Sequence, residues 1–593
     1  MSPRTVQSPP SRRSAIRPLL WILLAALIAT GALLGWRQAR LARVRAAVPA
    51  LPAAVPNATL RDLLTAAHVG AAGGDLAAVA ELGRLCHANE FRAEAEACWR
   101  LLIREQPREA RWHYYLADLR RSEGDQAAVE EQLELTVAAD PTAAAAWLRL
   151  AEMKFKSGRI DAAETGYRRR LELLPGDPYA ELGLARIAQL QGRTAETLSR
   201  LESLLQHQPK FSAAQNLYAE LQAAAGHEDL ADLHRWLGRE AGRFREADDP
   251  WMQEVDARCH EPRRLCHLGV IAYQTYQGDR GRARFEHALA LAPTDPLPAE
   301  MLGTLLLELG SAAAARDILA NGIARAASTP APLHYFNLSE ACRALQQSEP
   351  AHRALTDGLR VHPDSPDLLH AHGNLLKADG RIGEAAAAYR RALEVNPAFG
   401  EADFALAILL LESNRPDEAL RTLDHALGMR PTFPKALLLR ARLEMEAGRI
   451  ENAGRYLLPL LKANPGVPEI RQITANWHLE AGRTIEKKNP AAAEQHYRAG
   501  LALVPDDPDL NADLGVQLLI MHRAEEAVPM LEIYRRAQPA NPQAALFLGQ
   551  AYAHNGRIAE ARTVLAAGLR DAEQSGQTKT AQSLREILTM LPK

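Results

Sequence analysis

Aromatic residues and cysteines are scarce in this sequence of 593 residues: aromatic side chains make up 5% of it, and there are five cysteines. Because sheets favour β-branched and aromatic residues, such a composition suits helices better than sheets. An odd and sparse set of cysteines provides no disulfide framework. The chain is too long for one hydrophobic core, so we expect several domains or a repeat array.

The local signatures of catalysis are also absent. The sequence contains no HExxH zinc motif, no GxSxG nucleophile elbow, no GxxxxGK[ST] phosphate loop and no GxGxxG motif after a strand. The repeats, apolar run and linkers described below leave no stretch of about 100 residues for a separate catalytic domain. We therefore expect that the protein is not an enzyme and that it needs no cofactor.

Acidic residues are missing from the first 45 residues, which contain eight arginines. Without these eight, the 70 Lys and Arg residues of the chain fall to 62 against 72 Asp and Glu residues, so the body is mildly acidic. Phosphate binding requires a clustered cationic surface. Nucleic acid is therefore not an expected partner.

One long apolar run, residues 18–36, contains no charge and lies between Arg17 and Arg37. At 1.5 Å per residue, such a helix roughly spans the ~30 Å hydrocarbon layer of a membrane. No small-x-small cleavage site directly follows the run, so we interpret it as a transmembrane signal-anchor helix; a cleaved signal peptide and a buried core helix are the alternatives. Residues 1–17 would form a basic tail, and 37–75 a linker.

The topology of this expected anchor is not decided by charge, because four arginines lie on each side of the run. Long domains translocate largely regardless of flanking charge. We expect a single-pass membrane protein with its soluble body on the non-cytoplasmic, periplasmic side.

Prolines recur every 34 residues in two series, and glycines follow in step. Asn414 stands where this spacing expects a glycine, and Asn best replaces Gly in the left-handed conformation of a helix C-cap. Apolar residues with a period of 3.6 lie on both sides of each glycine, which predicts helix–turn–helix repeats. The series comprise Pro107, Pro141, Pro175 and Pro209; Pro363, Pro397, Pro431 and Pro465; and Gly124, Gly158, Gly192, Gly226, Gly380 and Gly448.

This repeat resembles the tetratricopeptide repeat, whose motif reads W-x2-L-G-x2-Y, then A-x3-F, then P. The best copies are residues 144–175, with Trp147 and Tyr167, and residues 366–397, with Gly373. The resemblance implies an all-α fold, namely an α-solenoid (a right-handed superhelix) of about fourteen helical hairpins behind the transmembrane helix.

A break in the repeat pattern divides the expected solenoid into two arms. The pattern breaks at residues 241–264, which are rich in charge and proline and which we interpret as an irregular connector. Rotation of the two flanking arms at this connector is a hypothesis. The expected parts are an N-terminal arm at 76–240, a C-terminal arm at 265–573 and a capping helix at 574–593.

The resemblance also implies a partner, because extended peptides or partner helices dock on the concave groove of this family, which the first helix of each repeat lines. Positions 2, 5, 9 and 12 of each repeat are expected to face the groove. Asn can pair with a peptide backbone, and Lys or Arg can hold a carboxylate, although solvated helix residues are the alternative. The candidate binding residues are His370, Asn374, Lys377, Arg442 and Asn476.

Cys259, His260, Cys266 and His267 are residue types that ligate metals. Haem attachment uses CxxCH, and zinc ligands pair two to four residues apart, whereas six residues separate these thiols. A local disulfide and plain surface cysteines stay open as alternatives.

We therefore expect a membrane-anchored scaffold or adaptor that mediates protein–protein interactions, in a bacterial envelope or assembly complex. The alternatives are a haem- or metal-associated redox or cytochrome-maturation component that uses Cys259–Cys266, and a regulatory subunit of a separate transferase. The sequence does not define the partner or the oligomeric state.

Overall fold

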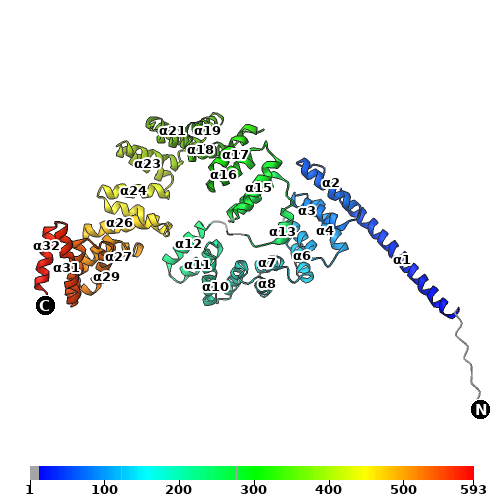
Figure 1. Cartoon of the computed structure of the whole chain (residues 1–593), viewed down its shortest axis with the longest axis horizontal. Coiled ribbons are helices and arrows are strands. Elements are labelled where there is room, and N and C mark those ends of the chain that lie inside the picture. Colours follow the sequence, from blue (N-terminus) through cyan, green and yellow to red (C-terminus); the bar gives the residue numbers. More distant parts are fainter. Residues whose placement is uncertain (1–12, 122, 242–243, 245, 276, 593) are drawn as a thin grey trace, which may run out of the picture. The chain divides into compact units, whose positions relative to one another are not determined.

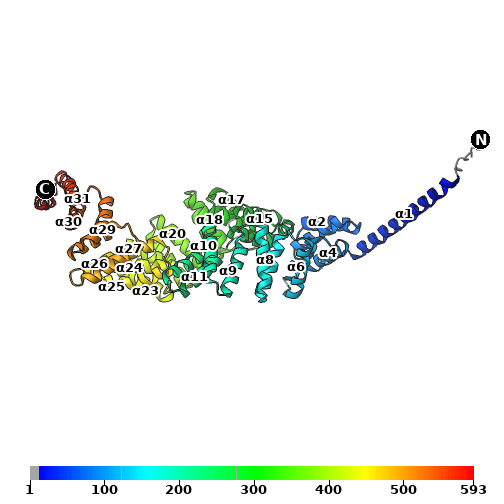
Figure 2. The ribbon, with the colours of Figure 1, turned by 90° about the horizontal axis from the view of Figure 1, so that it is seen from below.

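The computed structural model describes residues 13–592 except 122, 242–243, 245 and 276, and within these residues all regular structure is helical. After α1 (Arg13–Ala47) and α2 (Ala58–Ala72), fourteen helical hairpins follow one another, in agreement with the predicted number of repeats. Neighbouring hairpins pack against each other: the hairpin at residues 110–139 lies on the one at 144–173, and the hairpin at 508–537 lies on the one at 542–574 (Figure 1, Figure 2). The α-solenoid prediction is therefore confirmed for the described chain.

The chain divides into two compact units that are interleaved in sequence. Of the described residues, unit 1 holds those up to Ala214 and those between Ala241 and Ser348, and unit 2 holds Gln215–Ala241 and Ser348 onward. This division does not follow the expected arms on either side of residues 241–264. In unit 1 lie α3/α4 (Leu76–Ala88, Arg92–Glu105), α5/α6 (Ala110–Arg121, Gln126–Ala139), α7/α8 (Ala144–Lys156, Ile160–Leu173), α9/α10 (Pro178–Leu190, Thr194–His207), α13 (Pro250–Asp256), α14/α15 (Pro262–Gln274, Gly278–Leu291), α16/α17 (Pro296–Glu308, Ala312–Arg325) and α18 (Pro332–Ala344).

Unit 2 contains the remaining repeats, and α11 (Ser212–Ala224) begins in unit 1 and ends in unit 2. A distant segment joins these repeats, because Arg239 of α12 donates a 2.6 Å hydrogen bond to the Ala463 carbonyl. The helices of unit 2 are α12 (Glu228–Glu240), α19 (Ser348–Val361), α20/α21 (Pro366–Ala378, Ile382–Val395), α22/α23 (Gly400–Glu412, Pro416–Met429), α24/α25 (Pro434–Glu446, Ile450–Ala463), α26/α27 (Pro468–Ile485, Pro490–Leu503), α28/α29 (Pro508–Ile520, Ala524–Ala537), α30/α31 (Pro542–His554, Ile558–Gln574) and α32 (Thr578–Met590).

The turns inside the hairpins follow the expected glycine spacing. Gly380 and Gly448 have positive φ angles of 76° and 71°, and Asn414, between them in the series, has φ 56°. The prediction that Asn414 replaces glycine in the left-handed conformation is confirmed. First helices often begin with a proline after a capping side chain, as at Ser365 and Asp507, which accept hydrogen bonds from backbone N–H groups of the first turn.

The transmembrane prediction is wrong. Among the residues that the structure describes, no helix is long and apolar enough to cross a membrane, which contradicts both the helix expected at 18–36 and the single-pass localisation. α1 runs without a break beyond this stretch to Ala47, and Arg40 on it forms a 2.8 Å ion pair with Glu105 while Val44 is buried in the core of unit 1. The first twelve residues of the expected basic tail lie outside the described residues.

The connector (residues 241–264) is predicted to be irregular, but its residues from 246 onward contain helical structure. It contains α13, and α14 begins inside it at Pro262. Val255 and Cys259 are buried in the core that unit 1 builds from α2–α7 and α14–α18. The connector is therefore packed into unit 1.

Candidate functional site

The face expected to bind a partner consists of the side chains at positions 2, 5, 9 and 12 of the first helices, and we call it the first-helix face. In unit 1 it includes Arg84 on α3 and Tyr114 and Asp118 on α5, counted from the start of each helix. Tyr114 is buried, although it stands at a position expected to face a groove. The connector covers it.

Asp249 of the connector lies against Tyr114 and Arg149. The Tyr114 hydroxyl donates a 2.5 Å hydrogen bond to the Asp249 carboxylate, and Arg149 Nη2 lies 2.8 Å from the same oxygen. Asp249 also caps α13 by accepting a hydrogen bond from the Met252 N–H. The adjacent Trp251 meets the Tyr114 ring edge-on, with ring centroids 5.2 Å apart. An acidic and an aromatic side chain of the connector thus occupy this part of the face.

Asp118 also contacts Arg149 and thereby helps to hold this arginine in place. Its carboxylate is 2.7 Å from Arg149 Nη1 and 3.3 Å from His87 Nε2. Burial acts to raise the pKa of Asp118, but the hydrogen bond from His87 and the charge of Arg149 outweigh it, so this pKa lies well below its usual range. Asp118 therefore stays ionised and, with Asp249, shares Arg149.

The far end of the connector is fixed to α3 and to the turn after it. Arg258 pairs with Glu81 at 3.1 Å. The Asn89 amide donates to the Arg258 carbonyl at 2.9 Å and accepts from the His260 N–H at 2.7 Å. In addition, Glu254 accepts a hydrogen bond from the Tyr115 hydroxyl at 3.3 Å. Residues 249–260 consequently bind to α3 and α5 as an internal ligand, at Tyr114 of the first-helix face and at residues beside that face.

Unit 2 carries the five residues that the sequence predicts as a binding site. His370, Asn374 and Lys377 lie together on α20, whereas Arg442 and Asn476 lie on α24 and α26, and all five are at least partly exposed. The structure thus spreads the predicted site over first helices of three hairpins.

The predicted residues make contacts only of moderate strength. Tyr389 fits against Gly373, where a Cβ atom would come within 2.5 Å of its ring, and its hydroxyl donates a 2.8 Å hydrogen bond to Asn374. Lys377 pairs with Glu412 at 2.8 Å, and Arg442 lies 3.8 Å from Glu469. Exposed ion pairs of this kind contribute little and exchange readily.

Between the polar ends, the same face of unit 2 is apolar. Half-buried side chains occupy positions 5, 9 and 12 of α22 and positions 5 and 12 of α24. The three on α22 are not among the residues predicted from the sequence to bind a partner, although the position count that selects His370 and Asn374 also selects them. The five residues, which we call the apolar stripe, are Phe404, Ile408, Leu411, Leu438 and Met445.

The four residues considered as metal or haem ligands do not converge. Cys259 and Cys266 are buried and carry free thiols, and burial raises the pKa of the Cys266 thiol to about 12. His267 is exposed, and the His260 ring packs edge-on against His287. The described residues include no group of three or more His, Cys, Asp or Glu side chains that could hold a metal ion, and the disulfide alternative is not formed.

Two tetratricopeptide repeat family models match the chain, one at residues 376–427 and 518–584 and the other at residues 404–468. No curated protein matches it significantly. Among solved structures, it is similar to TTC0263, a thermophilic TPR protein of Thermus thermophilus, at 30% identity over 30% of this chain and 97% of that chain, with a TM-score of 0.27.

Two further solved structures are similar at lower identity. YrrB, described as a TPR protein with an unusual peptide-binding site, is 16% identical over 32% of this chain and 97% of that chain, with a TM-score of 0.26. The human IFIT1 dimer with PPP-AAAA is 17% identical over 69% of this chain and 93% of that chain, with a TM-score of 0.31. From the family models and the 34-residue period, we conclude that residues 376–468 and 518–584 of the chain consist of tetratricopeptide repeats.

Proposed function

We propose that this protein is a scaffold or adaptor in an assembly complex and that it binds a protein partner on the first-helix face of unit 2. Tetratricopeptide repeat proteins generally mediate protein–protein interactions. The apolar stripe gives this face a surface that a partner can bury, and apolar burial is the main driving force of association.

The observation that carries this proposal comes from unit 1. There, Tyr114, at position 5 of the first helix α5, holds residues 249–260 through its hydrogen bond to Asp249 and its ring contact with Trp251. The face is therefore suited to holding an extended or short helical segment. In unit 2, the ion pairs and hydrogen bonds given above for Asn374, Lys377 and Arg442 come from the same or an adjacent hairpin, and the apolar stripe offers a surface for an external ligand.

The partner that fits this surface is an extended segment with apolar side chains and at least one carboxylate. Its apolar groups would lie on Phe404, Leu438 and their neighbours in the stripe. Arg442, which lies 3.8 Å from Glu469, can exchange this weak pair for a carboxylate of the partner. Asn374 and Asn476 can hydrogen-bond the partner's backbone.

Affinity capture with matched variants tests the proposal. Replacing Asn374, Lys377 and Arg442 together by Ala should remove the partner that the unaltered protein captures, while the melting temperature stays the same because these side chains are at least partly exposed. A control variant carries alanine at Arg360, Arg391 and Lys462, which lie on second helices of unit 2. A partner retained by the first variant, or lost equally from both, would contradict the proposal.

A further inference from the structure

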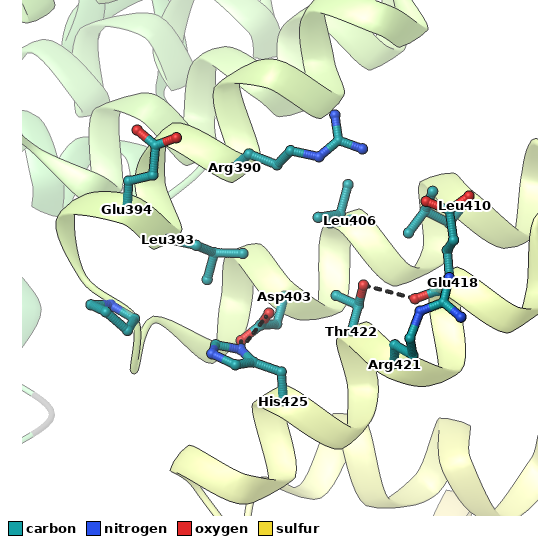
Figure 3. Close-up of a pocket in the computed structure, with 11 residues that line it drawn as sticks. Arg390, Leu393, Glu394, Asp403, Leu406, Leu410, Glu418, Arg421, Thr422 and His425 are labelled. Atoms are coloured by element: carbon teal, nitrogen blue, oxygen red, sulfur yellow. Dashed lines mark hydrogen bonds and ion pairs between the residues drawn. The ribbon is translucent and has the colours of Figure 1, made fainter.

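An open hollow of about 530 Å³ lies on unit 2 between α21 and α23, with α22 beneath it (Figure 3). Its rim comes from second helices, whereas the residues of the first-helix face come from first helices. Leu406 and Leu410, both buried, and the half-buried Leu393 give the hollow an apolar floor. It is therefore separate from the site proposed above.

A buried acid lies at one side of this hollow. Asp403 occupies the fourth position of α22, where the neighbouring first helices hold Leu369 and Leu437, and it is 1% exposed. The His425 Nδ1 atom lies 3.1 Å from both carboxylate oxygens, as the dashed lines in Figure 3 indicate. The pairing leaves Nε2 of this half-exposed ring for a ligand.

The acidic side chains at the rim of the hollow have ion-pair partners, whereas its arginines do not have one among the described residues. Its two rim acids, Glu394 and Glu418, already pair with Arg391 and Arg415, neither of which lines the hollow. By contrast, Arg390 and Arg421 line it, are exposed, and have no ion-pair partner in the described part of the chain. Because these two arginines outnumber Asp403, the one lining acid without an arginine partner, the hollow has an excess of positive charge above an apolar floor.

We propose that this hollow binds a carboxylate attached to an apolar group. Arg390 and Arg421 hold the carboxylate, and the apolar group lies on Leu393, Leu406 and Leu410. Arginine suits this task because its planar guanidinium can donate two parallel hydrogen bonds to a carboxylate. Two kinds of molecule carry a carboxylate attached to an apolar group: a polypeptide whose C-terminal residue is apolar, and a free small acid.

Probes that differ in one group at a time test this inference on the full chain by isothermal titration calorimetry. N-acetyl-leucine and the peptide Gly-Gly-Ala-Leu with a free C-terminus carry both elements. Their amides lack the charge, and acetate lacks the apolar group. The free acids should bind at least about tenfold more tightly than their amides and than acetate, since charge-assisted hydrogen bonds and apolar burial each contribute on this scale.

Two double variants of matched charge complete the test. Arg390→Gln with Arg421→Gln should weaken binding of the acids at least about tenfold. Arg536→Gln with Arg570→Gln removes the same charge from exposed positions of α29 and α31 and leaves every lining residue and its ion-pair partner in place, so it should change affinity less than about twofold. Binding of the peptide alone assigns the site to chain ends, and binding of both acids extends it to small molecules. Equal affinity for acids and amides, equal loss in both variants, or no binding of either acid would overturn the proposal.

Discussion

The first-helix faces of the two units occupy the same positions of the repeat, but they differ in their side chains and in what covers them. In unit 1 the face carries Tyr114 and Asp118, with Arg149 beside them, and residues 249–260 of the same chain cover it. In unit 2 the corresponding positions carry the apolar stripe between polar ends. The comparison teaches that position within the repeat does not determine whether a face is available. What determines the availability of the first-helix face is whether another segment of the chain, such as residues 249–260 in unit 1, folds onto it.

We expect the largest effect on stability at the covered first-helix face of unit 1, where one arginine pairs with two acids. Arg149 pairs with both Asp118 and Asp249, whose side chains are 11% and 16% exposed. Arg149→Met leaves two largely buried carboxylates without this cation, and we expect a loss of about 3 kcal/mol in the free energy of unfolding. Urea denaturation measures this loss, and hydrogen exchange of residues 250–258 should accelerate in the same variant.

An exposed ion pair of unit 1 provides the matched control. Arg168 pairs with Glu164 on α8 and its side chain is 64% exposed, so Arg168→Met should cost less than about 1 kcal/mol. If both variants lose the same stability, the Asp118–Arg149–Asp249 contact does not hold the connector. Strong protection of residues 250–258 in the unaltered protein, equal to that of α3, would also count against the hypothesis that the arms rotate at the connector.

The second-largest expected effect is a difference between the units in how a buried aspartate makes stability depend on pH. Asp118 in unit 1 has a pKa below its usual range because His87 and Arg149 outweigh its burial, whereas burial raises the pKa of Asp403 in unit 2 in spite of its contact with His425. A lowered pKa stabilises the fold above the unfolded pKa, and this stability is lost as the pH falls towards the folded pKa. A raised carboxyl pKa has the opposite sign: its cost is present at neutral pH and is relieved on acidification.

The variants Asp118→Asn and Asp403→Asn make this difference measurable. At pH 7, Asp118→Asn should destabilise the protein by about 1–3 kcal/mol, and Asp403→Asn should change stability little or raise it. Both differences from the unaltered protein should shrink as the pH falls from about 5 to 3, near the unfolded pKa of an aspartate. Urea midpoints at four or five pH values record them. A destabilisation by Asp403→Asn that matches that of Asp118→Asn at pH 7 would remove this contrast between the units.

The sequence predicts those features that depend on neighbours along the chain. The 34-residue period sets the number of hairpins, and the left-handed turn at Asn414 follows from its place between Gly380 and Gly448. Both are local consequences of helix length and capping. The residues predicted to bind a partner lie on the first helices α20, α24 and α26, because one count of positions applies to every repeat.

The remaining features depend on contacts between distant residues. Tyr114 and Asp249 are 135 positions apart, and no local pattern indicates that the charged connector folds onto α5. Cys259 looks like a surface residue by its charged neighbours, yet it is buried because the connector packs into unit 1. The sequence did contain a signal for Asp403, since a carboxylate at a position where adjacent repeats hold leucine marks an exception that needs a partner.

We expect the smallest effect on stability at a left-handed turn that occurs in both units but is formed by different residues. Gly124 in unit 1 has φ 81°, while the corresponding residue of α22/α23 in unit 2 is Asn414 at φ 56°. Asn414→Ala should cost about 1 kcal/mol, because a residue with a Cβ atom and no local hydrogen-bonding side chain is strained in this conformation, and Asn414→Gly should be neutral within about 0.5 kcal/mol. Thermal unfolding of the two variants side by side provides the measurement. Equal stabilities for the alanine and glycine variants would show that the turn relaxes when Asn414 is replaced, so that unit 2 would not share the rigid left-handed turn of unit 1.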